Sequence, residues 1–466
     1  MLRKLFCAAL ALALASCKLT PDYERPELGL PSAWLEPAEA SGSVVNLPWW
    51  ELYQDETLRG LIQAALDENE DLAIALLRIQ ELEYQLTVTR ADQFPFLDAF
   101  GGAGRGRASR QMTPGASATS QFSIGATLSF ELDLWRKFSR ATEAARADLL
   151  ATEAAHRSVT ITLVASVAST YFLLRDLDAR LAISEGTVKS RRQSLEIVQA
   201  RFDRGTVPEL DVNQAQIELA TAEVAVAGFE RSTVQTRNAL RVLLGRFPGP
   251  IERGLALTEQ PLPPEVPAGL PSELLSRRPD IAVAEQQLIA DTARVGVAEA
   301  FRYPAVSLSG SIALVTDELT DFNTSEAKAW NIAADLFQPL FNSGRLKAQS
   351  RAQAARAEQA VHAFVATVQQ ALREVEDSLI AVRTLRTEHE ARARQVVAAR
   401  NAARLSRARY DAGVVDYLEL QDAERTLFAS ELDESATRQA ALTAVVGLYK
   451  ALGGGWEAEL AAVPQP

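Results

Sequence analysis

The chain has 466 residues, of which 47% are hydrophobic and 23% charged, and its 60 acidic side chains outnumber 48 basic ones. The net charge of −12 excludes a dedicated nucleic-acid binder, which needs a basic surplus. Its two cysteines, Cys7 and Cys17, are too few for a disulfide-rich scaffold or for a zinc cluster with four cysteine ligands.

The N-terminus has the pattern of a secretory signal. Two basic residues precede an unbroken apolar run over residues 5–15, which is too short to cross a membrane as a helix. The run ends in Leu14-Ala15-Ser16-Cys17, which resembles the box at which bacterial lipoproteins are cleaved and acylated. We therefore expect a lipoprotein signal peptide at 1–16 and a covalent lipid, palmitate included, on Cys17. An ordinary signal followed by an incidental cysteine is the alternative. Among such lipoproteins, Lys18 in place of aspartate implies sorting to the outer membrane.

The remaining chain is predicted to be a tandem duplication. Asp71-Leu72 recurs as Asp280-Ile281, and Phe94-Pro95 as Tyr303-Pro304, each roughly 209 positions later. Between the copies, seven prolines predict an extended linker rather than a packed element. The expected divisions are a lipidated extended segment at 17–48, a first repeat at 49–245, the Pro-rich linker at 246–278, a second repeat at 279–453 and a C-terminal tail at 454–466.

Each repeat is expected to begin with a helix and to end in a long helical hairpin, at 136–245 and at 344–453. Residues 345–412 contain neither Gly nor Pro and would span about 100 Å as one helix. Its apolar residues alternate spacings of four and three, which is typical of a coiled-coil seam. The seam residues are Val361, Val365, Val368, Leu372, Val375, Leu379 and Val382. Helices of this length exceed one globular core, so partner helices are expected to cover them.

Two strands are expected before each hairpin, at about 94–107 and 119–135 and at about 303–315 and 328–341. Over residues 122–134, apolar and polar residues alternate, which gives a strand one apolar and one polar face. A soluble sheet with one buried face and a transmembrane β-strand share this alternation. Open edges are not tolerated in lipid, and four strands cannot close around water. A sheet in the membrane would therefore have to be shared among several chains.

Motifs from Cys17 to about Gly453 together resemble the TolC-like outer membrane efflux protein family, in its lipoprotein (OprM- and NodT-like) branch. They are Cys17, Pro21-Asp22-Tyr23-Glu24-Arg25-Pro26, Trp49-Trp50, Phe130-Glu131-Leu132-Asp133-Leu134-Trp135, Arg277-Arg278-Pro279-Asp280-Ile281 and two glycine turns after the long helices. The resemblance implies a mostly α protein with transmembrane β-strands. Each chain of a homotrimer would give four strands to a twelve-stranded outer-membrane barrel and coiled-coil helices to an α-barrel in the periplasm.

The same resemblance implies an exit duct that works with a periplasmic adaptor and an inner-membrane transporter, of the resistance-nodulation-division (RND) type. It carries a gate role onto Leu418, Glu419, Asp422 and Arg425. Glu419 and Asp422 are three residues apart and project from one helix face, so a trimer would have rings of carboxylates at a narrow mouth. Tyr410 and Asp211 match positions that brace neighbouring hairpins in the closed state. The adaptor would dock on the turns, at Gly205, Thr206, Val207, Gly413, Val414 and Val415.

Enzymatic and cofactor chemistry are not indicated. There is no GxSxG elbow or phosphate-binding loop, and His156, His362 and His389 lack carboxylate or thiol partners at metal-ligand spacing. We expect neither a metal nor a cofactor beyond the covalent lipid. Two alternatives to the duct remain open: a lipid-anchored periplasmic coiled-coil scaffold without a pore, and an outer-membrane component of type I protein secretion. The exported substrate is not indicated by the sequence.

Overall fold

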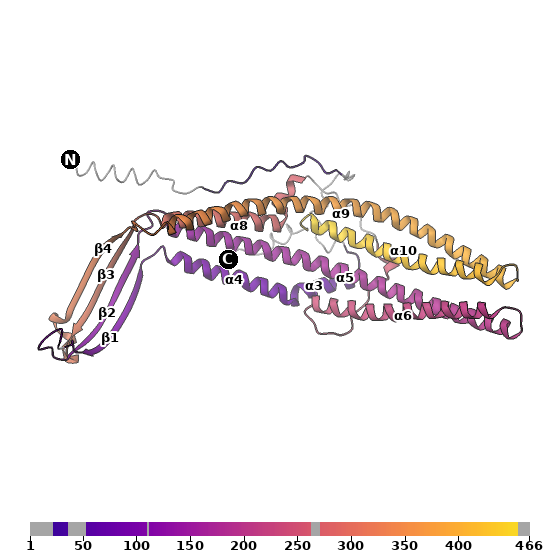
Figure 1. The fold of residues 1–466 in the computed structure, drawn as a ribbon, viewed down its shortest axis with the longest axis horizontal. Coiled ribbons are helices and arrows are strands. Elements are labelled where there is room, and N and C mark those ends of the chain that lie inside the picture. Colours follow the sequence, from indigo (N-terminus) through magenta and orange to yellow (C-terminus); the bar gives the residue numbers. More distant parts are fainter. Residues whose placement is uncertain (1–21, 36–52, 110, 262–270, 455–466) are drawn as a thin grey trace. The chain divides into compact units, whose positions relative to one another are not determined.

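The computed structural model describes residues 22–35, 53–109, 111–261 and 271–454 (Figure 1). The predicted signal peptide, Cys17 and nearly all of the predicted tail therefore lie outside the described residues. The chain divides into two compact units. Unit 1 comprises Met1–Leu28, Arg78–Glu153 and Val283–Val365, and unit 2 comprises Gly29–Leu77, Ala154–Ala282 and Ala366–Pro466.

Unit 1 contains a four-stranded antiparallel sheet in the order β1-β2-β3-β4 (Figure 1). The strands are β1 (Phe96–Gly106), β2 (Thr119–Glu131), β3 (Ala305–Thr316) and β4 (Lys328–Phe337). The register places Ile124 opposite Leu314 and Ile312 opposite Trp330. Apolar residues of all four strands therefore share one face, which we call the apolar face, while serines and other small or polar residues dominate the opposite face.

The predicted second strand is too long at its C-terminal end. The alternation predicts an end at residue 135, but β2 ends at Glu131. The Asp133 carboxylate accepts hydrogen bonds from the Phe138 and Ser139 amides at 3.0 and 2.8 Å, which satisfies the first turn of the following helix. Arg136 has a φ of 59°, so the chain turns sharply between the strand and that helix.

The helices make up most of the described chain. They are α3 (Glu56–Glu68), α4 (Glu70–Ala91), α5 (Lys137–Asp203), α6 (Glu209–Leu243), the short α7 (Leu274–Arg277), α8 (Pro279–Ala300), α9 (Arg345–Asp411) and α10 (Tyr417–Ala451). Short 3₁₀ turns occupy Leu257–Glu259, Pro271–Glu273, Leu319–Asn323 and Ser325–Ala327. Both α5 and α9 contain 67 residues, or about 100 Å of helix. In Figure 1, α6 folds back along α5, and α10 along α9.

The predicted seam on α9 coincides only in part with the stripe that is most deeply buried within the single chain. The most deeply buried residues there are Phe364, Val368, Ala371 and Val375, and only two of these belong to the predicted set. Val361, Val365 and Leu372 are half-buried instead. Because Phe364 and Ala371 also follow spacings of three and four, two neighbouring stripes on α9 satisfy the same rule, and packing within the single chain buries the second one.

One window of α5 has the length and composition of a membrane-crossing helix. Its 18 residues have a mean hydropathy of 1.4 and at most two charged side chains. However, 56% of that window is buried within the structure, as in the core helix of a soluble protein. Val167, Ala168 and Tyr171 are among the fully buried residues of this helix.

The Pro-rich segment is packed where the structure describes it, contrary to the expectation of an extended, unpacked linker. Leu257 and Gln260 are buried, and the carboxylate of Asp55 holds the segment in place. Asp55 accepts hydrogen bonds from the Tyr171 hydroxyl at 2.8 Å, from the Leu255 amide at 3.0 Å and from the Gln260 side chain at 2.6 Å. A buried carboxylate needs such donors, so the segment supplies part of the core of unit 2.

Candidate gate at the hairpin turns

Both long hairpins close through the same backbone turn. Gly205 and Gly413 each have a φ of 72°, in the left-handed region that favours glycine. In each turn the glycine amide donates to the carbonyl three residues earlier, at 2.7 and 3.0 Å. The next amide donates to the carbonyl five residues before it, at 3.0 and 2.9 Å. These bonds satisfy the last carbonyls of α5 and α9 and leave the two glycines, Thr206 and Val414 exposed.

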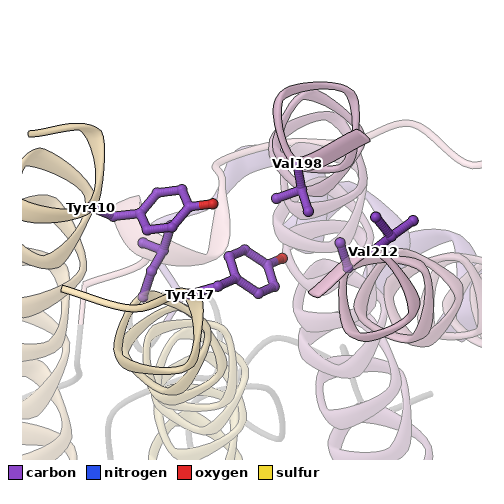
Figure 2. Packing of buried hydrophobic residues seen from close by; sticks show 6 residues of the cluster. Val198, Val212, Tyr410 and Tyr417 are labelled. Atoms are coloured by element: carbon purple, nitrogen blue, oxygen red, sulfur yellow. The ribbon is translucent and has the colours of Figure 1, made fainter. Parts of the chain in front are cut away.

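Directly behind the turns, an apolar cluster joins the two hairpins of unit 2 (Figure 2). Its buried members are Val198, Val212, Ala215, Tyr410, Tyr417 and Leu420. They come from all four hairpin helices, and the ring centroids of Tyr410 and Tyr417 lie 5.6 Å apart. Val207 and Val415 in the turns pack against this cluster. Burial, and after it the Glu424 carboxylate, raise the pKa of Tyr417 to about 12, so its hydroxyl stays neutral near pH 7.

A buried ion-pair centre lies beside the cluster, with the carboxylate of Glu218 in its middle. The Arg191 guanidinium donates to the Glu218 carbonyl at 2.6 Å and lies 3.0 Å from the Glu218 Oε2 atom. Arg425 donates through Nε to Oε1 at 2.5 Å, and the Gln421 side chain donates to Oε1 at 3.2 Å. The side chains of Arg191 and Glu218 are only 4% and 8% exposed. Glu218 thus links its own hairpin to the other one through charge-assisted hydrogen bonds.

The four residues predicted for the gate lie in the first three turns of α10, but their surroundings differ. Leu418 is exposed, and Glu419 forms an ion pair with Arg409 of α9 at 2.7 Å. Asp422 is exposed, and none of the described residues forms an ion pair with its carboxylate. Arg425 donates a hydrogen bond to Glu218 in the other hairpin. The structure therefore does not gather all four side chains, and Asp422 carries the one uncompensated carboxylate among them.

Tyr410 and Asp211, predicted to brace neighbouring hairpins, lie on different hairpins of the same chain. The Tyr410 ring stacks under the Arg201 guanidinium at 4.5 Å. Its hydroxyl is buried and makes no hydrogen bond to Asp211. Burial, and after it the nearby Asp416 carboxylate, raise the pKa of Asp211 above its ordinary value. Within one chain, Asp211 thus faces a like charge, and no bracing bond joins the two predicted residues.

Sequence reasoning missed Arg191, Glu218 and Arg409. A signal for the first pair was present, because Arg191 and Glu218 lie at nearly equal distances before and after Gly205 and so must face each other across the hairpin. Among the described residues, no three His, Cys, Asp or Glu side chains are close enough together to hold an ion. The apolar cluster and the Glu218 ion pairs are what the structure shows at the gate region.

Comparisons with known proteins agree with this architecture. A family model described as "Outer membrane efflux protein" matches residues 61–246 and 270–454. The cation efflux system protein CusC of Escherichia coli K12 is 34% identical over 460 residues, covering 97% of this chain and 99% of the relative. The solvent efflux pump outer membrane protein SrpC of Pseudomonas putida is 34% identical over 455 residues, covering 96% and 97%.

Solved structures share the fold. The outer membrane channel MtrE of Neisseria gonorrhoeae superposes with a TM-score of 0.85 at 30% identity, covering 94% of this chain and 98% of that one. The sequence resemblance and the predicted class of fold, mostly helical with four antiparallel strands, are thereby confirmed. The chain belongs to the TolC-like outer membrane efflux protein family of non-enzymatic transport proteins, and it is an outer-membrane channel of an efflux pump that extends into the periplasm.

Proposed function

We propose that the chain works as a homotrimeric exit duct for a tripartite efflux system. The observation that carries this proposal is the open four-stranded sheet with one continuous apolar face. Trp330 and Ile332 on that face are 76% and 81% exposed in the single chain. The two edge strands, β1 and β4, have unpaired outer edges, which lipid does not tolerate. Three copies that pair β4 with the next β1 would close a twelve-stranded barrel around a polar interior.

The helices support the same assembly. Helix α4 buries no residue in the single chain, although it carries Tyr84 and Val88 with large apolar surfaces exposed. Such an apolar stripe on a long helix calls for further helices to cover it. Neighbouring copies in a trimer would supply them.

We also propose that a lipid on Cys17 anchors the chain beside the barrel. In unit 1, Asp22 pairs with the buried Arg140 at 2.6 Å, in the first turn of α5. Tyr23 and Arg25 both donate to Glu285 on α8, at 2.7 and 2.5 Å. Cys17 lies five residues before Asp22 and so can be no further than about 18 Å from it. Arg140 follows closely after β2, so the lipid would reach the bilayer at the base of the sheet. Mass spectrometry of the mature N-terminal peptide tests this, and a peptide without the mass of acyl chains would contradict it.

At the gate, we propose that three copies of Asp422 form the main carboxylate ring at the periplasmic mouth, with Glu419 compensated by Arg409. Bracing between subunits by Tyr410 and Asp211 remains part of this proposal. Cations would concentrate at such a constriction, because charged rings in narrow pores select by sign.

The turns at 204–207 and 412–415, exposed except for the half-buried Val207 and Val415, are proposed to receive the tips of the adaptor. A cysteine placed at Val414, which is exposed, would cross-link to the adaptor if this is correct, whereas one at the buried Leu420 would not.

The relatives' names differ in what is exported, cations for CusC and solvents for SrpC, at the same 34% identity. We therefore assign the choice of substrate to the inner-membrane transporter, proposed to be of the RND type.

Labelling in the membrane distinguishes this duct from a periplasmic scaffold without a pore. Ile332 lies on the apolar face and its neighbour Asn331 on the opposite face. In whole cells, the Ile332→Cys variant should react with a lipid-soluble thiol probe and resist a water-soluble one, because lipid covers that face. The Asn331→Cys variant is the matched control and should show the reverse. Equal reaction of both variants with the water-soluble probe would support a soluble sheet instead.

A further inference from the structure

A groove crosses the apolar face of the sheet. It has a volume of about 520 Å³ and lies over β2, β3 and β4. The side chains that line it on this face are those of Ile124, Ala126, Ile312, Leu314, Lys328 and Trp330. The register explains the grouping, because Leu314 lies opposite both Ile124 and Lys328. A groove with this apolar lining suits a hydrocarbon chain.

One end of the groove is cationic. Lys328 is the first residue of β4, its side chain is exposed, and none of the described residues forms an ion pair with it. A lysine on a lipid-facing surface is costly unless its ammonium reaches the polar interface or meets an anion there. Trp330, two residues further on the same face, presents the amphipathic ring that favours this interface. The groove therefore combines an apolar lining with a positive charge at the loop end of the sheet.

A second cation lies at the same end of the sheet. Arg105 is on β1, on the apolar face, next to the loop that joins β1 to β2. Strands β1 and β4 form the two edges of the sheet, so closure of the proposed barrel pairs β4 of one copy with β1 of the next. Because Arg105 lies near the end of β1 and Lys328 at the start of β4, that pairing puts the partner subunit's Arg105 at the same loop end of the barrel as Lys328. Both cations then face outward at the loop end of the barrel, which the proposed function places in the outer leaflet.

We propose that this groove, with Lys328 and the partner subunit's Arg105, binds a phosphorylated, multiply acylated lipid of the outer leaflet. An acyl chain would fill the groove and the phosphate would pair with the two cations. Charge complementarity favours an anionic lipid over a neutral one. This inference rests on the proposed trimer, because the two cations belong to different copies.

The experiment measures lipid binding to the detergent-extracted trimer by native mass spectrometry. The probes are bisphosphorylated lipid A and the same lipid after removal of its phosphates. EDTA is present throughout, because Asp317, Glu318, Asp321 and Glu326 in the neighbouring loop could otherwise hold a phosphate through a divalent cation. The Lys328→Gln and Arg105→Gln variants are compared with Lys347→Gln, which removes an exposed lysine on α9.

We expect the wild-type trimer to prefer the phosphorylated lipid, and each of the two test substitutions to weaken that binding about fivefold, since a cation at a lipid surface contributes about this much. The control should bind like wild type, and Trp330→Ala should weaken binding of both lipids. A conducting trimer that binds both lipids equally, or that is unaffected by Lys328→Gln, would overturn the lipid site alone. A chain that forms no trimer would overturn the proposed function and the site with it.

Discussion

Replacing Glu218 with alanine is expected to loosen the hairpin ends more than any other single change near the turns. The change leaves the Arg191 guanidinium buried without its carboxylate and frees Arg425 from the opposite hairpin. Burial lowers the pKa of Arg191 even though the Glu218 carboxylate acts to raise it. The lowered pKa shows that holding the positive charge of Arg191 away from water costs free energy. Breaking a buried pair by removing one partner costs about 3 kcal/mol or more.

Hydrogen exchange of amides in α6 around residue 218 would measure this loss, and a rise of about 100-fold in exchange is expected from that cost. Glu223→Ala is the matched control, since Glu223 lies on the same helix and pairs at 3.2 Å with Arg192, both side chains being half-exposed. That exposed pair should contribute less than about 1 kcal/mol. Equal effects of the two substitutions would contradict a stabilising role for the ion-pair centre.

Replacing Asp422 with asparagine is expected to weaken block of the channel by divalent cations. In the proposed trimer the substitution removes three carboxylates at once from the mouth, and the half-blocking concentration should rise about tenfold, equivalent to about 1.4 kcal/mol. Glu419→Gln should have a smaller effect, because it also releases the positive charge of Arg409. Changing Glu419 and Asp422 together to alanine should in addition enlarge the conductance.

Single-channel recording with added Mg²⁺ would measure the block. Asp433→Asn serves as the control, since this exposed carboxylate lies further along α10 and pairs with Arg392 at 3.0 Å. If Mg²⁺ blocks the Asp422→Asn channel at the same concentration as the wild-type channel, Asp422 does not line the mouth of the pore.

Local patterns in the sequence predicted much of the fold. The alternation around Ile124 and Ile332 follows from the period of a strand, and the registers place both residues on one face. The bounds of α9 follow from a run without Gly or Pro that ends at the left-handed Gly413. The alternation and the helix bounds depend on residues that are close together in the chain, so they can be predicted from short stretches of sequence.

Features that depend on distant residues were not predictable in this way. The Gln260 side chain donates a hydrogen bond to Asp55, which lies 205 positions earlier in the chain. This bond holds the Pro-rich segment against the core of unit 2, whereas its prolines alone indicate an extended linker. The family pattern places Arg425 at the gate, but its partner Glu218 lies 207 positions away on another hairpin. Which of two apolar stripes on α9 becomes buried also depends on the helices beside it. Charge pairing and packing between elements decide such details, and periodicity within one element does not encode them.

A trimeric conduit across the outer membrane should be visible as ion conductance. It can be tested by recording from the detergent-extracted protein in planar lipid bilayers, after the mass of the extracted species has been measured. We expect a species near three times the 50.6 kDa of the chain that produces discrete ion-conducting steps. A monomeric species that inserts without producing any conductance would show that the chain is not a trimeric channel.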